Sequence, residues 1–342
     1  MQTVYAEDAA WCGTVFRKSQ GEYSVHLDNR IVSCALSNRL RKELVYPVAR
    51  EAKIRSGLRG GVVAVDDIPV VDPVAIGDRV RIIPAEEGRG MIVEVLPRRN
   101  ELVRRAAGAR KLKQVIVANA DQILPVIAAA QPRLSWELLD RYLAAAEDAG
   151  LNACIVITKL DLVDDRDIVE EIETYRRIGY PAILTSTRTG RGIEELKGVL
   201  KNCISVTAGK SGVGKTSLLN SVQPGLGLRV SGVSAATGKG KHTTTYLEMF
   251  RLEMGGAVVD TPGMREFGIW NDSTARQRHE HETVDVAHLF REMRPYLGGC
   301  RFGLDCSHRR EPGCAIRKAV DAGDVSERRY RSYLRIAGDT DA

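Results

Sequence analysis

The sequence predicts a multidomain protein with an N-terminal β-barrel, a central α/β domain and a small, mostly helical C-terminal domain. A chain of 342 residues has room for about two or three domains. Short strand-like runs continue to about Arg105, strand-like and helical runs alternate from Val115 to about Trp270, and helical runs flank a cysteine cluster after Asn271. We therefore place the three domains at 1–108, 109–270 and 271–342.

The composition is ordinary for a globular protein, with 44% apolar residues, 27% charged residues and a formal charge of +6. No apolar run approaches the roughly 18 residues that cross a bilayer, and the first residues are acidic where a secretion signal would be basic and then apolar. We expect a cytoplasmic monomer with no membrane partner. In a reducing compartment, cysteines among apolar neighbours are typically small buried hydrophobic residues. These are Cys12, Cys34, Cys154 and Cys203.

The N-terminal domain is predicted from short runs rich in β-branched residues and separated by turn residues. Several short strands at this spacing favour a small barrel, with the OB-fold as the leading candidate. The predicted strands are 12–18, 23–28, 30–36, 61–67, 77–84 and 90–97.

The central domain alternates strands with helices. "QVIVANA" (114–120), "ACIVITKL" (153–160) and "AVVDTPG" (257–263) have the pattern of strands, and residues 136–150 have the pattern of a helix that ends at a glycine. This alternation indicates a parallel sheet flanked by helices.

The strongest motif is "GKSGVGKT", which follows the strand-like "CISVTA" and precedes the helical "SLLNSV". Its glycines allow backbone N–H groups to surround phosphate oxygens, Lys215 is expected to reach the outer phosphates, and Thr216 to bind magnesium. The plain alternative is a glycine-rich turn with a chance lysine. The predicted phosphate-binding residues are Gly209, Lys210, Ser211, Gly212, Val213, Gly214, Lys215, Thr216 and Ser217.

Two further stretches complete the phosphate and magnesium site. In "VVDTPG", Asp260 is expected to hold magnesium through a water and the Gly263 N–H to contact the terminal phosphate. In "GKGKHTTTY", the hydroxyl of Thr243 or Thr244 is expected to complete the magnesium shell. Alone, the first is a common turn and the second a solvated basic loop.

Guanine recognition is predicted for "ITKLDL". Asp161 can accept two hydrogen bonds that only guanine donates, and the stem of Lys159 can lie along the ring. Thr158 stands where this motif usually has Asn, and offers one hydroxyl in place of an amide. The backbone N–H groups near Ser186 and Thr187 are expected to face the guanine oxygen, although a plain helix N-cap explains that stretch equally well.

A set of metal-binding residue types lies close together near the C-terminus: Cys300, Cys306, His308 and Cys314. Three thiolates and an imidazole can close a tetrahedral structural zinc site with no open position, and a reducing cytosol favours metal over disulfides. Free thiols or another metal are the alternatives. His279 and His281 in "RHEHE" have no cysteine nearby, so we interpret them as part of a solvated helix or loop face.

Two clusters of Lys and Arg are candidates for RNA binding. Charge runs are more commonly solvated faces, and few aromatic residues accompany these. The first cluster is Arg39, Arg41, Lys42, Arg50, Lys53, Arg55 and Arg59, and the second is Arg98, Arg99, Arg104, Arg105, Arg110, Lys111 and Lys113.

The order of these motifs is unusual, because the base motif precedes the phosphate loop. That order resembles the circularly permuted GTPases. Within them the chain is similar to the RsgA (YjeQ) family, the ribosome small subunit-dependent GTPases. The resemblance is close from Asn119 onward and rests on "ANADQILPVIAAAQP", "LLDRYLAAAE", "ITKLDL", "GKSGVGKTSLLN", "GKGKHTTT", "DTPGMREFG" and "CRFGLDCSHRREPGC". In this family the first two cysteines usually lie one residue closer together, so the loop is expected to bulge here.

The resemblance implies an OB-fold, a permuted P-loop GTPase domain and a zinc domain acting together. The implied activity is GTP hydrolysis with magnesium, in late maturation of the small ribosomal subunit and in contact with its rRNA. Turnover is expected to be stimulated by the subunit and coupled to release. The alternatives are a permuted GTPase serving the large subunit and an RNA-binding scaffold that holds GTP with negligible turnover.

The attacking water is the least defined part of the predicted site. Many GTPases orient it with a glutamine after the D-x-x-G motif, where this chain has Met264, which cannot hold a water. The nearest side chain able to do so is His242, in the loop with Thr243 and Thr244. We predict His242 as the catalytic group, with Lys215 and these threonines assisting. A solvated histidine beside Lys241 is the plain alternative.

Overall fold

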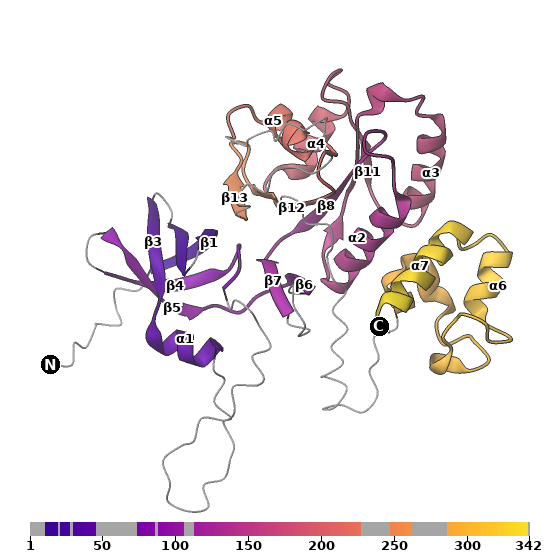
Figure 1. Cartoon of the computed structure of the whole chain (residues 1–342), viewed down its shortest axis with the longest axis horizontal. Helices are drawn as coiled ribbons and strands as arrows, with labels where there is room; N and C mark the ends of the chain where they lie inside the picture. The colour runs from indigo at the N-terminus through magenta and orange to yellow at the C-terminus, as the bar shows by residue number, and fades with distance from the viewer. Residues whose placement is uncertain are drawn as a thin grey trace, which may run out of the picture. The chain divides into compact units, whose positions relative to one another are not determined.

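The computed structural model describes residues 11–19, 21–27, 30–45, 74–85, 88–105, 113–226, 247–260 and 286–340 (Figure 1). The chain forms two compact units. The first comprises residues up to Ala120 together with 247–250, and the second comprises Asp121 onward apart from those residues. Within the described residues, no helix is long and apolar enough to cross a membrane.

The first unit contains a closed barrel of five strands, as the OB-fold prediction requires. Neighbouring strands follow the order β1-β2-β3-β5-β4, β3 and β5 run parallel, and pairing of β1 with β4 closes the ring. Helix α1 (Asn38–Val45) follows β3. The strands are β1 (Trp11–Ser19), β2 (Glu22–Leu27), β3 (Arg30–Leu36), β4 (Arg79–Pro84) and β5 (Gly90–Val95).

Alternation of apolar and polar residues fills the barrel. Val15, Val25, Val80, Ile82 and Ile92 are fully buried inside it, because alternate side chains of a strand point to the same face. Five of the six predicted strands are confirmed, and the sixth, 61–67, lies outside the described residues.

A hairpin of β6 (Glu101–Arg105) and β7 (Lys113–Ala118) also belongs to the first unit. The strand predicted at 114–120 is therefore present, but it pairs with β6 in a separate antiparallel sheet and not in the parallel sheet. The amide of Asn119 fixes the end of the hairpin, donating to the Gly77 carbonyl at 3.0 Å and accepting from the Arg99 N–H at 2.8 Å.

The second unit is built on a parallel sheet in the order β11-β10-β8-β12-β14. Short β9 (Asn152–Ala153) extends the pairing of β8. The sheet confirms the predicted α/β domain. Its strands are β8 (Gln122–Ala128), β10 (Ile155–Thr158), β11 (Ala182–Leu184), β12 (Ile204–Ala208) and β14 (Ala257–Asp260), and β13 (Glu248–Arg251) precedes β14 along the chain.

Helices cover both faces of this sheet (Figure 1). Leu124, Val126 and Ala128 share a core with α4 (Ile193–Leu200) and α5 (Lys215–Val222). The intervening residues of β8 point to the other face, on which α2 (Trp136–Asp148) packs; α3 (Arg166–Arg177) packs against β11.

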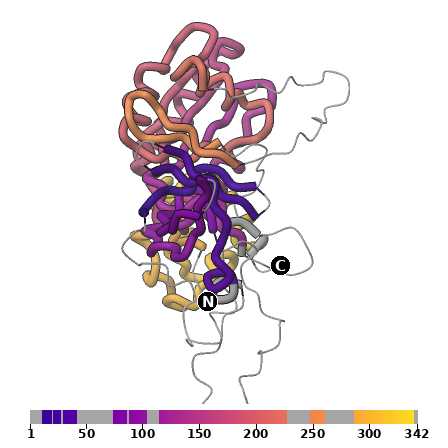
Figure 2. Tube along the Cα trace, turned by 90° about the vertical axis from the view of Figure 1, so that its left-hand side faces the viewer, coloured from indigo at the N-terminus to yellow at the C-terminus, as the bar shows by residue number. Residues whose placement is uncertain are grey.

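The C-terminal region packs against α2 and lies away from α4 and α5, as Figure 1 shows with its helices in yellow; Figure 2 shows the same region in yellow, turned by 90°. The helical run expected before the cysteine cluster consists of two short 3₁₀ helices, η5 (Val286–Leu289) and η6 (Arg291–Tyr296). Pro295 lies within η6 and cannot donate a backbone hydrogen bond. The remaining elements are η7 (Gly303–Asp305), α6 (Ala315–Asp321) and α7 (Glu327–Thr340).

Candidate functional site

The predicted nucleotide-binding motifs meet at one edge of the sheet. Strands β8, β10, β11, β12 and β14 run parallel, so the loops after their carboxyl ends lie together. The base motif follows β10, the second base loop follows β11, the phosphate loop follows β12, and Asp260 ends β14. Motifs that are distant in the sequence are therefore neighbours, whichever comes first along the chain.

The phosphate loop has the shape its glycines predict. Gly212 and Gly214 have φ values of +80° and +96°, which other residues rarely adopt. A Cβ at Gly209 would lie 2.4 Å from the Val126 carbonyl oxygen, so the loop packs directly on the end of β8. The loop leads into the first turn of α5, where backbone N–H groups are free of intrahelical partners and suited to an anion.

Lys215 is folded into this loop. Its side chain is 7% exposed, and Nζ donates to the carbonyl oxygens of Gly209 at 2.7 Å and Lys210 at 3.3 Å. Burial lowers the pKa of Lys215 below its usual value, and the negative charge of Asp260 acts in the opposite direction. An anion among the loop N–H groups would favour the charged form of this amine.

Asp260 is buried at the end of β14, beside β12. The Thr207 hydroxyl lies 3.3 Å from its Oδ1. A buried carboxylate next to the phosphate loop fits the ligand chemistry that magnesium prefers.

Thr158 joins the base motif to the phosphate loop. Its hydroxyl donates to the Val213 carbonyl oxygen at 2.5 Å, and the side chain is almost fully buried. The amide that usually occupies this position would make the same kind of link. A single hydroxyl therefore holds the two loops together here.

Lys159 makes two further connections. Its backbone is left-handed, with φ of 59°, and its Nζ donates to the carbonyl oxygens of Gly212, at 2.7 Å, and Gln131. Its ammonium thus bridges the phosphate loop and the segment that leads into α2. The four-carbon stem of Lys159 therefore reaches from the base motif to these two carbonyl oxygens, and a base can lie against it.

Asp161 is exposed, and the Ser186 hydroxyl donates to its Oδ1 at 2.6 Å. The Ser186 N–H donates to the Arg191 carbonyl oxygen at 3.1 Å within its own loop. The exposed Thr187 follows immediately. The structure thus brings both predicted base loops into direct contact.

Five residues that we considered for magnesium, the terminal phosphate or the attacking water lie outside the residues that the structure describes. They are His242, Thr243, Thr244, Gly263 and Met264.

The four predicted metal ligands form one buried cluster. Their ligand atoms all lie within 4.8 Å of one another. Cys300 Sγ is 3.9 Å from Cys314 Sγ and 3.4 Å from His308 Nδ1, and Cys314 Sγ is 3.5 Å from the same nitrogen. Tetrahedral zinc with Zn–S bonds of about 2.3 Å sets its sulfur ligands about 3.8 Å apart. The buried cluster therefore suggests a structural zinc ion.

The environment of the thiols also fits a cation. Burial disfavours the Cys300 thiolate, but the Ala315 N–H, the neighbouring thiols and His308 outweigh that effect and lower its pKa. Burial raises the pKa of Cys306 to about 12. A bound divalent ion would reverse that preference by coordinating the thiolate.

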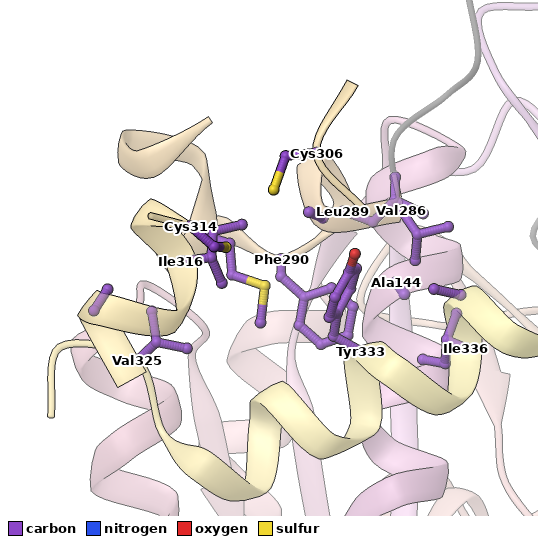
Figure 3. Packing of buried hydrophobic residues seen from close by; sticks show 14 of the residues in the cluster. Ala144, Val286, Leu289, Phe290, Cys306, Cys314, Ile316, Val325, Tyr333 and Ile336 are labelled. Carbon is purple, nitrogen blue, oxygen red and sulfur yellow. The ribbon is translucent and has the colours of Figure 1, made fainter. Parts of the chain in front are cut away.

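The cluster is packed against α7, as Figure 3 shows. Tyr330 donates to the His308 carbonyl oxygen at 2.6 Å, and Tyr333 donates to that of Ser307 at 3.0 Å. Phe290 meets Tyr333 edge to face, with ring centroids 5.8 Å apart. The ligand loop, η5 and α7 therefore share one small core.

A buried ion network, which the sequence did not indicate, fastens this region to α2. Arg329 is 1% exposed and donates to Asp140 at 2.7 Å and to Glu292 at 2.7 and 2.9 Å. Arg328 donates to the other oxygen of Asp140 at 2.8 Å, and Tyr175 donates to Asp140 at 2.6 Å. No local pattern could reveal this network, because Asp140 and Arg329 are 189 residues apart.

The charges in this network are compensated. Burial would raise the pKa of Asp140, but the positive charges of Arg329 and Arg328, and hydrogen bonds from Ser332 and Tyr175, outweigh it and lower the pKa. A second link lies near the end of α2, where Glu147 accepts from Arg291 at 2.7 Å and from Arg294 at 2.5 Å.

Part of the second basic cluster is structural and not an RNA surface. Arg98 donates to both oxygens of the fully buried Asp78, at 2.7 and 2.8 Å, and to Glu101 at 2.9 Å. Arg99 donates to the Asn119 carbonyl oxygen at 3.0 Å. The sequence did not indicate that Asp78 is a partner of Arg98, because the two residues are 20 positions apart. In both basic clusters, most of the Lys and Arg side chains are not among those that the structure describes.

Comparison with known proteins agrees with this geometry. A model of the RsgA GTPase family matches residues 95–270. The chain is 44% identical over 265 residues to the small ribosomal subunit biogenesis GTPase RsgA of Gemmatimonas aurantiaca, covering 77% of this chain and 83% of that protein. It is 39% identical over 323 residues to the protein of the same name from Moorella thermoacetica, covering 94% of each.

Solved structures show the same likeness over nearly the whole chain. YjeQ from Thermotoga maritima superposes with a TM-score of 0.68 and 31% identity, covering 96% of this chain and 98% of that one. YloQ, described as a circularly permuted GTPase, superposes with a TM-score of 0.61 and 25% identity, covering 98% and 97%. The chain therefore belongs to the RsgA (YjeQ) family of circularly permuted, GTP-hydrolysing enzymes.

Proposed function

We propose that this GTPase acts in late maturation of the small ribosomal subunit, binds the subunit through its rRNA, and is released when GTP is hydrolysed. The direct contact between the base and phosphate loops, through Thr158 to Val213 and Lys159 to Gly212, carries the GTPase part of this proposal. Relatives named for small-subunit biogenesis match most of the chain. The barrel and the Cys₃His cluster supply the two flanking modules.

Each loop has a proposed part in the reaction. Asp161 accepts hydrogen bonds from the guanine edge, and Lys159 covers the ring. Lys215 and the phosphate-loop N–H groups hold the outer phosphates. Magnesium bound with the nucleotide would neutralise charge on the phosphate oxygens. Thr216, Asp260, Thr243 and Thr244 are its proposed ligands, and the Gly263 N–H the proposed contact to the terminal phosphate.

We assign the water-orienting role to His242. Met264 stands where many GTPases have glutamine, so intrinsic hydrolysis should be slow. Docking on the subunit would place the imidazole of His242 beside the attacking water. His242→Ala should keep the affinity for GTP and lose most of the subunit-stimulated turnover, an effect of about 10³-fold. Equal stimulation of this variant and the parent would assign the water to backbone, a threonine or the ribosome.

The proposed function is tested by phosphate release with no ribosomes, with small subunits and with large subunits. Stimulation by small subunits alone is the expected result. Stimulation by large subunits alone would favour a large-subunit factor. Absence of turnover with either subunit, despite GTP binding, would favour an RNA-binding scaffold. Sedimentation of the sample without ribosomes tests our expectation that the protein is a monomer.

A further inference from the structure

A pocket of about 320 Å³ lies between the start of α2 and the side of α7, next to the buried ion network. Four arginines, one acid and one tryptophan supply its chemistry: Arg133, Arg328, Arg331, Arg335, Glu137 and Trp136. None of the predicted nucleotide or metal residues lines it. The pocket therefore has no role in the site described above.

The arginines of the pocket differ in how they are held. Arg328 is fixed by Asp140 and Glu171, so it shapes the wall. Arg331 and Arg335 are 66% and 62% exposed and pair with the exposed acids Glu327 and Glu137. Such surface pairs contribute little in water and leave most guanidinium donors available to an anion.

Arg133 is also exposed, and no ion pair connects it to any residue that the structure describes. Arg331 and Arg335 are separated by one helical turn, about 6 Å. One of the three guanidinium groups comes from the segment before α2 and two come from α7, so they are spread out. They suit successive phosphates of a nucleic acid strand better than a single free phosphate.

Trp136 gives the pocket an aromatic wall of fixed orientation. Its ring stacks on Tyr175 with centroids 5.8 Å apart and planes inclined by 28°, and the Arg328 guanidinium lies 5.6 Å from its centroid. A held aromatic ring next to guanidinium groups is the arrangement on which proteins stack a base while tracking its backbone.

We propose that this pocket binds one nucleotide of a single-stranded RNA segment. The base lies against Trp136, and Arg133, Arg331 and Arg335 contact the flanking phosphates. The proposal rests on the proposed function for the source of the RNA, the small ribosomal subunit. Because the phosphate contacts carry no sequence information, the site should accept RNA of any sequence with a salt-dependent affinity.

The test uses the full chain and a fluorescein-labelled hexauridylate, with binding followed by anisotropy at several salt concentrations. The triple variant R133Q/R331Q/R335Q should bind at least about 10-fold more weakly. Its salt slope should fall by about 2, because each neutralised phosphate of a single strand contributes about 0.7 to the slope. The matched control R310Q/R317Q/K318Q neutralises three exposed cations of the same region outside the pocket and should bind as the parent does.

A second pair of variants tests the aromatic wall. Trp136→Phe keeps a ring and should bind like the parent, whereas Trp136→Leu should lose about 10-fold in affinity. Cross-linking of 4-thiouridine RNA to the parent should label residues 133–137 or 328–335. Three results would overturn the proposal. The control triple variant could bind RNA as weakly as the pocket triple variant, or the pocket triple variant could bind RNA as the parent does. An equal concentration of polyglutamate could also displace the RNA.

Subunit-stimulated GTP turnover separates this proposal from the proposed function. If the pocket variants bind RNA like the parent while small subunits still stimulate the parent, the pocket assignment is wrong and the function stands. If small subunits do not stimulate the parent, the proposed function fails whatever the oligonucleotide shows.

Discussion

Thr158 shows how one residue can replace the group that a motif usually contains. Its hydroxyl donates to the Val213 carbonyl oxygen at 2.5 Å, and Lys159 donates to the neighbouring Gly212 carbonyl oxygen. The base and phosphate loops therefore stay connected without an asparagine amide. From the sequence alone the rigidity of this connection was open, because a threonine hydroxyl has several possible acceptors.

Removing that hydroxyl should weaken nucleotide binding. Thr158→Val keeps the shape of the side chain but leaves the Val213 carbonyl oxygen without this donor, and we expect affinity for GDP to fall about 3- to 10-fold. Titration calorimetry measures the effect. Thr158→Asn restores a donor and should bind like the parent. Equal affinities of the valine variant and the parent would show that the link between the loops has no part in binding.

Helix α2 is the element shared by the GTPase sheet and the C-terminal region. One face packs on β8, while Asp140 and Glu147 bind arginines of η6 and α7. In the segment leading into α2, the Gln131 carbonyl oxygen accepts a hydrogen bond from the Lys159 ammonium. The C-terminal region is thus attached to the helix that begins next to the base loop.

Breaking this attachment should destabilise the unit strongly. Asp140→Asn leaves Glu292 as the one negatively charged partner of the buried Arg329, and we expect the free energy of unfolding in urea to fall by about 3–5 kcal/mol. Glu327→Gln, which removes only an exposed pair, should cost about 1 kcal/mol or less. A loss for Asp140→Asn as small as that for Glu327→Gln would mean that the network does not hold the region.

The contribution of Asp140 should also depend on pH in a defined direction. Its folded pKa lies below the unfolded value of about 3.9, so the stabilisation is fully present above that pH and is lost as the pH falls through the folded pKa. The difference in stability between the parent and Asp140→Asn should therefore be constant near neutral pH and shrink only in strong acid. A difference that shrinks near pH 7 would point to another group.

The Cys₃His cluster should behave as a structural metal site. Purified protein should carry about one zinc ion per chain, and Cys306→Ser should lose it and increase hydrogen exchange in α6 and α7. Cys12, which was predicted to be buried, is an exposed cysteine of the barrel, and Cys12→Ser should keep the metal. Unchanged exchange in the presence of a strong chelator would contradict a structural role.

Local sequence was sufficient to predict the phosphate loop, the cysteine cluster and the strands before the base motif, the phosphate loop and Asp260, because those features depend on neighbouring residues. The pairing of β7 with β6 and of Arg98 with Asp78 was not predictable, since an isolated strand or charge does not specify its partner. The same limit applies to Asp140 and Arg329, which meet only once α7 packs on α2. Spatial partners distant in sequence are what the structure adds.

At the scale of the whole molecule, the order of the motifs determines where the chain continues after the D-x-x-G motif, which we propose contacts the terminal phosphate. Both base loops, the phosphate loop and Asp260 meet at one edge of a parallel sheet, so a different cut in the chain leaves their arrangement intact. In this order the chain passes from Asp260 and the D-x-x-G loop directly to the C-terminal region. We infer that the nucleotide state is communicated to the C-terminal region. Through that region, the nucleotide state sets the affinity of the protein for the ribosome.

The most direct test of this account is the affinity for purified small subunits, measured by sedimentation with a non-hydrolysable GTP analogue and with GDP. We predict binding at least about 10-fold tighter with the analogue, within the usual range of coupling between two sites. Lys215→Ala, which lacks the charge that we propose holds the outer phosphates, should show no such difference. Equal affinity of the parent with the two nucleotides would contradict the account, because hydrolysis could then not drive release.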